Sequence, residues 1–129
     1  MFITSKQIKK RLFRLFPDLE VPWFRDVAYE LPSLEQVREF LERSKVNEYH
    51  FVDEFFDCDD FALQLHAEVK REHHWAFGEA FGDKFNGEEK LHNLNIFMAD
   101  DYEIYLVEPQ TDKIWLAVRG RDNILIVGM

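Results

Sequence analysis

Hydrophobic positions in the first part of the chain recur at three- and four-residue intervals, the spacing of an amphipathic helix. A first helix is predicted from about Ser5 to Phe16. Ile8, Leu12 and Leu15 fall on one stripe there, and Pro17 follows to end the helix. Residues 17–32 hold three prolines, which predicts an irregular connection rather than a further helix.

Two more helices are predicted from their first residues. Ser33 followed by Gln36 matches a capping box, in which each residue satisfies a free backbone N–H group of the other. Asp57 is a suitable N-cap for a third helix because its carboxylate can accept from free backbone N–H groups. The buried stripe of this third helix is predicted to consist of Phe61, Ala62, Leu65 and Val69.

After the third helix the apolar pattern changes to period two, which predicts β-strands. The expected strands are residues 75–81, 91–98, 102–107, 113–118 and 123–127, separated by turn-forming sequence. Helices followed by a run of strands indicate an α+β fold, with N-terminal helices packed on one face of a C-terminal antiparallel meander sheet. A length of 129 residues predicts a single domain over residues 1–129.

Composition supports a packed core and narrows the location of the protein. Hydrophobic residues make up 47% of the chain, which argues against disorder. A single cysteine cannot form an internal disulfide, and no apolar run approaches the roughly 20 residues that span a bilayer. We therefore expect a cytoplasmic protein without a membrane partner.

The net charge of −9 is unevenly distributed. Five bases between Lys6 and Arg14 precede the first acidic residue, which leaves −14 for the rest of the chain. An acidic body argues against nucleic acid as a partner, because that binding requires neutralisation of phosphates. The basic helix could touch an anionic surface or partner, but a solvated surface face is the favoured interpretation.

The only cysteine, Cys58, falls in the sequence DCDDF at the start of the third predicted helix. A helix N-terminus stabilises a thiolate through its free N–H groups, and a nearby histidine can take the proton. The neighbouring Asp59 and Asp60 oppose this effect, since like charge disfavours the thiolate. Whether these two aspartates help or block the thiol is left open by the sequence.

Strand alternation points to His92 and Glu108 as partners of the thiol. His92 shares a strand face with Leu94 and Ile96, which predicts that it points toward the helices. A three-residue loop at 99–101 would place His92 directly opposite Glu108 on the next strand, with their Cβ atoms about 4.5–5.5 Å apart. The carboxylate would orient the imidazole, which would activate the thiol.

The run DCDDFALQL, followed by a strand histidine and a strand carboxylate, resembles the transglutaminase-like cysteine peptidases of the papain-like superfamily. HNLNIF and YLVEPQTDKI also resemble segments of small phage and prophage proteins of that superfamily. The resemblance implies a papain-like fold, with Cys58 as nucleophile, His92 as base and Glu108 as the third residue. Gln110 or Asn95 would supply a polar contact to the substrate.

The predicted function is thiol-dependent acyl chemistry, by hydrolysis or transfer at an amide, isopeptide or thioester of a peptide or protein substrate. The alternative is a catalytically inactive papain-like interaction protein, of phage origin, that binds a protein partner. A metal site built from Cys58, His92, Asp59 and Glu108 is less favoured, because their spacing matches no zinc motif. No cofactor is expected, and the oligomeric state is not readable from the sequence.

Overall fold

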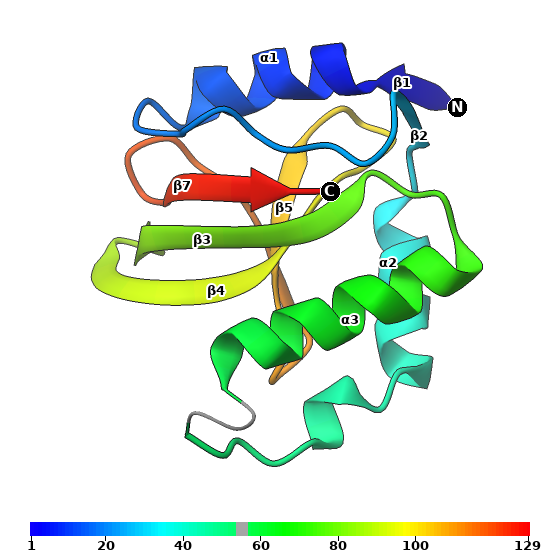
Figure 1. Cartoon of the computed structure of the whole chain (residues 1–129), viewed down its shortest axis with the longest axis vertical. Coiled ribbons are helices and arrows are strands. Elements are labelled where there is room, and N and C mark those ends of the chain that lie inside the picture. The colour runs from blue at the N-terminus through cyan, green and yellow to red at the C-terminus, as the bar shows by residue number, and fades with distance from the viewer. Residues whose placement is uncertain (54–56) are drawn as a thin grey trace.

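The computed structural model describes residues 1–53 and 57–129, and Figure 1 shows their arrangement. The helices are α1 (Ser5–Leu15), α2 (Leu34–Arg43), the short 3-10 helix η1 (Val46–Glu48) and α3 (Cys58–Glu72). The strands are β1 (Phe2–Thr4), β2 (Ala28–Glu30), β3 (Phe77–Phe85), β4 (Glu88–Met98), β5 (Ile104–Glu108), β6 (Lys113–Leu116) and β7 (Asn123–Gly128). The three predicted helices are confirmed, whereas β1 and β2 were not predicted.

Local capping explains why the helices begin where the sequence predicts. The Ser33 hydroxyl accepts from the backbone N–H of Gln36 at 3.0 Å, and the Gln36 side chain accepts from the N–H of Ser33 at 2.8 Å. This reciprocal pair confirms the capping box before α2. Asp57 is the N-cap of α3, and its N–H donates to the Asp60 carboxylate at 3.1 Å.

The five-stranded antiparallel sheet has the order β6-β5-β4-β3-β7. The prediction of a simple meander, in which each strand pairs with the next along the chain, is therefore wrong. The last strand pairs with β3 at the far edge instead of with β6. Asp122 accounts for this return, because its carboxylate accepts from the backbone N–H of Asn86 at the β3–β4 turn. The next residue, Asn123, then lies in register with Lys84 of β3.

The turn between β3 and β4 is tighter than the pattern suggests. Asn86 and Gly87 both have positive φ, at 52° and 83°, as the two central residues of a type I′ hairpin turn require. The two strands therefore continue through most of the sequence FGDKFNG, which was predicted to be a loop. The longer hairpin includes His92 and Asn93 in β4, paired with Gly82 and Phe81 of β3.

Helices cover both faces of the sheet, which corrects the prediction that all of them pack on one face (Figure 1). On one face the α1 residues Ile8, Leu12 and the following Phe16 pack with Leu94, Ile96 and Met98 of β4. On the other face α2 and α3 contribute Phe40, Phe61 and Leu65, which pack with Phe77, Phe97 and Val107. Each fully buried side chain of this size contributes about 1.5–3 kcal/mol of hydrophobic stabilisation.

The proline-rich connection lies along the free edge of β7. The N–H groups of Glu20 and Trp23 donate to the carbonyls of Leu125 and Val127, and Met129 N–H donates to the Trp23 carbonyl. Residues 20–25 therefore extend the sheet by one irregular strand and hold Trp23 in a fixed position. None of the helices formed by residues 1–53 and 57–129 is both long enough and apolar enough to cross a bilayer.

Candidate functional site

Cys58 is the first residue of α3, as predicted, and its side chain is half-buried. The polar group beside the thiol is the side-chain amide of Asn93, whose Nδ2 lies 3.9 Å from Sγ and donates a weak hydrogen bond. An amide nitrogen has no lone pair available to take a proton at neutral pH. Asn93 therefore contacts the thiol but cannot act as the base that takes its proton.

His92 and Glu108 do meet, but through a register that differs from the predicted one. The imidazole Nε2 shares a hydrogen bond with the Glu108 carboxylate, and both side chains are largely buried. Met98 lies opposite Ile104, so continuing the ladder places Leu94, not His92, opposite Glu108. A slip of two residues keeps a side chain on the same face, which allows the diagonal contact.

The predicted face of β4 is wrong, and this separates the imidazole from the thiol. His92 packs edge-on against Phe85, at 5.8 Å between ring centroids, within the core on the α1 side. Asn93 points to the opposite face and reaches α3. Among the described residues, no hydrogen bond or ion pair joins Cys58 to His92.

Asn95 explains why the face was misassigned. Its amide Nδ2 donates to the carbonyls of Ala62 in α3 and Gly78 in β3, at 2.8 and 3.1 Å, and the residue is fully buried. A buried amide is tolerated because these carbonyls satisfy its donors. The structure thus gives Asn95 a role in joining α3 to β3, and a substrate contact by Asn95 stays a prediction.

Gln110, the other suggested substrate contact, lies in the turn after β5. Its backbone N–H donates to the Glu108 carboxylate at 3.2 Å, which fixes that carboxylate from the side opposite His92. The role that the structure gives Gln110 is thus carried by its backbone. A substrate contact by its side chain stays a prediction.

Three aspartates surround the start of α3 and are the residues best placed to hold a metal ion. Asp57, Asp59 and Asp60 each bring one carboxylate oxygen within 4.8 Å of the others. The hydrogen bond from Asp57 N–H to the Asp60 side chain accounts for most of this closeness through helix capping. The cluster is therefore explained by local structure alone.

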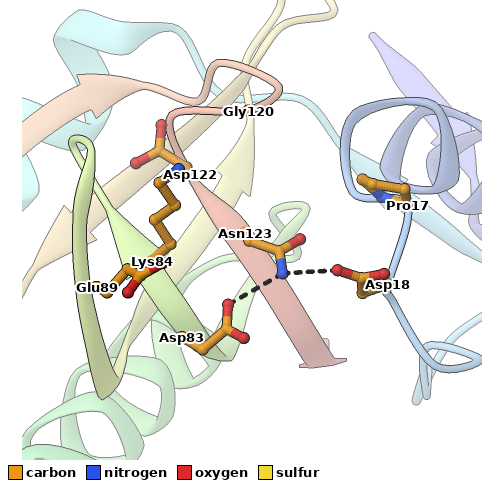
Figure 2. Close-up of a pocket in the computed structure, with 8 residues that line it drawn as sticks. All are labelled: Pro17, Asp18, Asp83, Lys84, Glu89, Gly120, Asp122 and Asn123. Carbon is orange, nitrogen blue, oxygen red and sulfur yellow. Dashed lines mark hydrogen bonds between the residues drawn. The ribbon is translucent and has the colours of Figure 1, made fainter.

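A polar cavity of about 520 Å³ opens between the end of α1 and the β3–β7 edge. Figure 2 shows Asn123 between two carboxylates, with its Nδ2 donating to Asp18 and to Asp83 at 3.0 Å each. The remaining residues that line the cavity are Pro17, Lys84, Glu89, Gly120 and Asp122. No aromatic side chain lines it, and three of its carboxylates, those of Asp18, Asp83 and Asp122, already accept hydrogen bonds from protein donors.

A second groove, of about 240 Å³, lies on the α3 face of the sheet beside Trp23. It is lined by Trp23, Arg25, Glu79, Ala80, Phe81, Asn93, Ile126 and Gly128, and we call it the Trp23 groove. The Trp23 side chain is 60% exposed, and the Arg25 guanidinium lies 4.6 Å from the ring centroid. The groove thus combines an exposed aromatic ring with a guanidinium, a carboxylate and an amide.

Neighbouring contacts hold the polar groups of this groove in place. His66 of α3 is nearly fully buried, and its Nδ1 shares a hydrogen bond of 2.7 Å with the Glu79 carboxylate. Lys70 of α3 pairs with Asp26, and this hydrogen bond lowers the pKa of Asp26 below its usual range. Arg25 takes part in no ion pair within the described part of the chain, so its charge remains available to a ligand.

Sequence reasoning missed the Trp23 groove because no local pattern marks it. Trp23 lies in the proline-rich connection, where neither helical nor strand periodicity predicts which way a side chain points. Its exposure follows from the pairing of residues 20–25 with β7, which is a long-range contact. The one available signal is a tryptophan followed two residues later by an arginine in irregular sequence.

Comparison with known families decides the identity of the domain. The family described as the ricin-type beta-trefoil lectin C-terminal domain matches residues 6–127. The chain belongs to this family. The lectin C-terminal domain shows no match among curated proteins.

Two solved lectin structures share the fold of this lectin C-terminal domain. The complex of PSL1a with E64 superposes with a TM-score of 0.79 at 20% sequence identity, and the match covers 99% of this chain and 51% of that one. The Polyporus squamosus lectin bound to Neu5Aca2-6Galb1-4GlcNAc superposes with a TM-score of 0.75 at 22% identity, covering 99% and 49%. The chain therefore spans about half the length of these lectins.

These findings correct three predictions made from the sequence. The resemblance to transglutaminase-like and papain-like cysteine peptidases is overturned by the lectin family and the lectin structures. The same findings contradict the predicted papain-like layout and the predicted thiol-dependent acyl chemistry. They also contradict the description of the protein as a peptidase or hydrolase. The geometry agrees, because Cys58 contacts an amide while His92 lies on the other face. No comparison assigns a role to Cys58, His92 or Glu108 individually.

Proposed function

We propose that this lectin C-terminal domain binds carbohydrate without catalysis, and that the Trp23 groove is its binding site. The family and both structural neighbours are lectins, which supports a binding partner in general and a glycan in particular. One neighbour is bound to Neu5Aca2-6Galb1-4GlcNAc. The chain spans only half of each neighbour. We therefore propose specifically that this half itself binds a glycan.

The chemistry of the Trp23 groove suits a sugar ring. A pyranose presents apolar C–H groups on its faces and hydroxyl groups around its rim. The exposed ring of Trp23 offers an apolar surface on a backbone that is hydrogen-bonded to the β7 edge. The Glu79 carboxylate can accept from hydroxyls, the Arg25 guanidinium can donate to them, and the Asn93 amide can do both.

The observation that carries the proposal is the exposed Trp23 side chain, fixed at the sheet edge beside polar groups that are themselves held in place. Pre-positioned groups lose little conformational freedom on binding, which favours affinity. The larger cavity of Figure 2 is the weaker candidate, because it lacks an aromatic ring and Asn123 already engages two of its carboxylates.

The experiment is a binding screen of the 129-residue chain on immobilised oligosaccharides, followed by calorimetry with the strongest ligand and with Neu5Aca2-6Galb1-4GlcNAc. Trp23→Ala should weaken binding at least about tenfold, since losing an aromatic contact of about 1.4 kcal/mol has that effect. Phe51→Ala is the matched control, because Phe51 is a comparably exposed aromatic residue outside the groove.

Two results would overturn the proposal. One is the absence of binding to every oligosaccharide in the screen by a chain whose circular dichroism shows it to be folded. The other is equal affinity of the wild type and Trp23→Ala, which would place the glycan elsewhere on the domain.

A further inference from the structure

The outer face of α1 is a concentrated positive surface on an otherwise acidic protein. Its exposed or half-exposed bases are Lys6, Lys9, Lys10 and Arg14. Arg11 forms an ion pair with Glu103 at 2.8 Å, whereas those four bases form none within the described residues. Their charge is therefore not neutralised by the domain itself.

The fold adds a further cation that the sequence does not place there. The exposed Arg119, in the turn between β6 and β7, donates from its Nη1 to the carbonyl of Arg14 at 3.1 Å. We call Lys6, Lys9, Lys10, Arg14 and Arg119 the basic strip. The distance along the helix axis from Lys6 to Arg14 is about 12 Å, because each residue of an α-helix rises by about 1.5 Å.

We propose that the basic strip binds a single-chain anionic polysaccharide, with sulfate or carboxylate groups along its length. Charge complementarity supplies the attraction, because none of the five bases of the strip forms an ion pair within the described residues. Phe13 is 39% exposed on the same helix and offers an apolar contact to the C–H faces of sugar rings.

The narrow width of the strip favours binding of a single polysaccharide chain over a nucleic acid duplex or a membrane. Acidic residues adjoin it: Asp18 and Glu20 follow the helix, and Glu103 contacts Arg11. The remainder of the chain carries −14. A flat anionic membrane or a nucleic acid duplex would bring phosphates against these acids, whereas a single polysaccharide chain can follow the strip alone.

This surface lies apart from the Trp23 groove. Helices α1 and α3 lie on opposite sides of the sheet (Figure 1). The residues that line the groove include Glu79 and Asn93, which contact α3. The proposal therefore does not depend on the proposed function. Trp23→Ala should retain full binding to the anionic polysaccharide. A failure of the proposed glycan site can therefore be distinguished from a failure of the basic strip to bind.

The test uses heparin as the probe, on the folded full chain at about 0.15 M salt, where screening limits attraction to roughly 8 Å. Wild type should bind, and the double variant Lys6→Glu, Lys10→Glu should bind at least tenfold more weakly. The control, Lys45→Glu with Lys113→Glu, changes two other exposed lysines by the same total charge and should bind like wild type.

Three results would overturn the inference. The wild type could fail to bind heparin, or both double variants could lose binding equally, which would indicate a response to net charge alone. Vesicles containing phosphatidylserine could compete as effectively as free heparin, which would identify a membrane surface as the partner. Circular dichroism of each variant verifies that the exposed substitutions leave α1 folded.

Discussion

Replacing Asp122 by alanine should cost the domain a large part of its stability. The carboxylate is buried and accepts three hydrogen bonds: from Asn86 N–H at 2.9 Å, from Trp115 Nε1–H at 3.1 Å and from Val118 N–H at 3.0 Å. Hydrogen bonds to a charged group contribute roughly 1.5–3 kcal/mol each. Some rehydration of the abandoned donors reduces the total, which we place at about 3–5 kcal/mol.

Urea denaturation followed by tryptophan fluorescence measures this loss. With a slope of about 1–3 kcal/mol per molar urea, the midpoint should fall by roughly 1–5 M. Asp18→Ala is the control, because Asp18 is an exposed carboxylate that accepts from Asn123 at 3.0 Å. It should change the free energy of unfolding by no more than about 0.5 kcal/mol. A loss below about 1 kcal/mol for Asp122→Ala would refute the claim that this carboxylate anchors the β6–β7 connection.

Three further variants test other parts of the structure. A Cβ at Gly78 would lie 2.1 Å from the Gly128 carbonyl oxygen, so Gly78→Ala should separate β3 from the C-terminal residues. The melting temperature should fall by more than 5 °C, roughly the shift expected for a loss of about 2 kcal/mol in the free energy of unfolding. Burial raises the pKa of Asp112 to about 6, above its unfolded value of about 3.9, so its charged form destabilises the fold increasingly as pH rises from about 4 to 6. Asp112→Asn should therefore unfold at higher urea than wild type at pH 7.5 and at the same urea at pH 3.5. His92→Ala should leave the rate at which iodoacetamide alkylates Cys58 unchanged within about twofold, because the two side chains lie on opposite faces of the sheet. A slowing of about tenfold would show instead that His92 activates the Cys58 thiol.

Elements that depend on neighbouring residues were predictable from the sequence. The capping pairs Ser33–Gln36 and Asp57–Asp60 fix the starts of α2 and α3 through contacts only three residues apart. The position of β7 was not predictable in this way. It depends on Asp122 reaching Asn86, 36 residues away in the sequence, and strand periodicity contains no information on such a partner.

The candidate site shows the same limit more sharply. The alternation of β4 correctly divides its residues into two sets, but it does not state which set faces α3. Asparagine is mostly exposed in proteins, yet Asn95 is buried on the α3 face because the Ala62 and Gly78 carbonyls accept from its amide. With that face reversed, His92 is carried away from Cys58, although its contact with Glu108 survives.

Residues 20–25 have one further consequence, for self-association. An open sheet edge offers unpaired N–H and C=O groups on which another chain can form a strand and aggregate. On the β7 side, backbone hydrogen bonds from Glu20, Trp23 and Met129 occupy these groups. The opposite edge is β6, a strand of only four residues that begins with the exposed Lys113. Edge-to-edge polymerisation requires both edge strands of a sheet to have an unpaired outer side. Among the described strands, this sheet leaves only the outer side of β6 unpaired, and that strand is short and charged. Loosening the Trp23 connection, for example by proteolytic cleavage near Pro22, should therefore free the β7 edge and increase assembly through it relative to the intact chain.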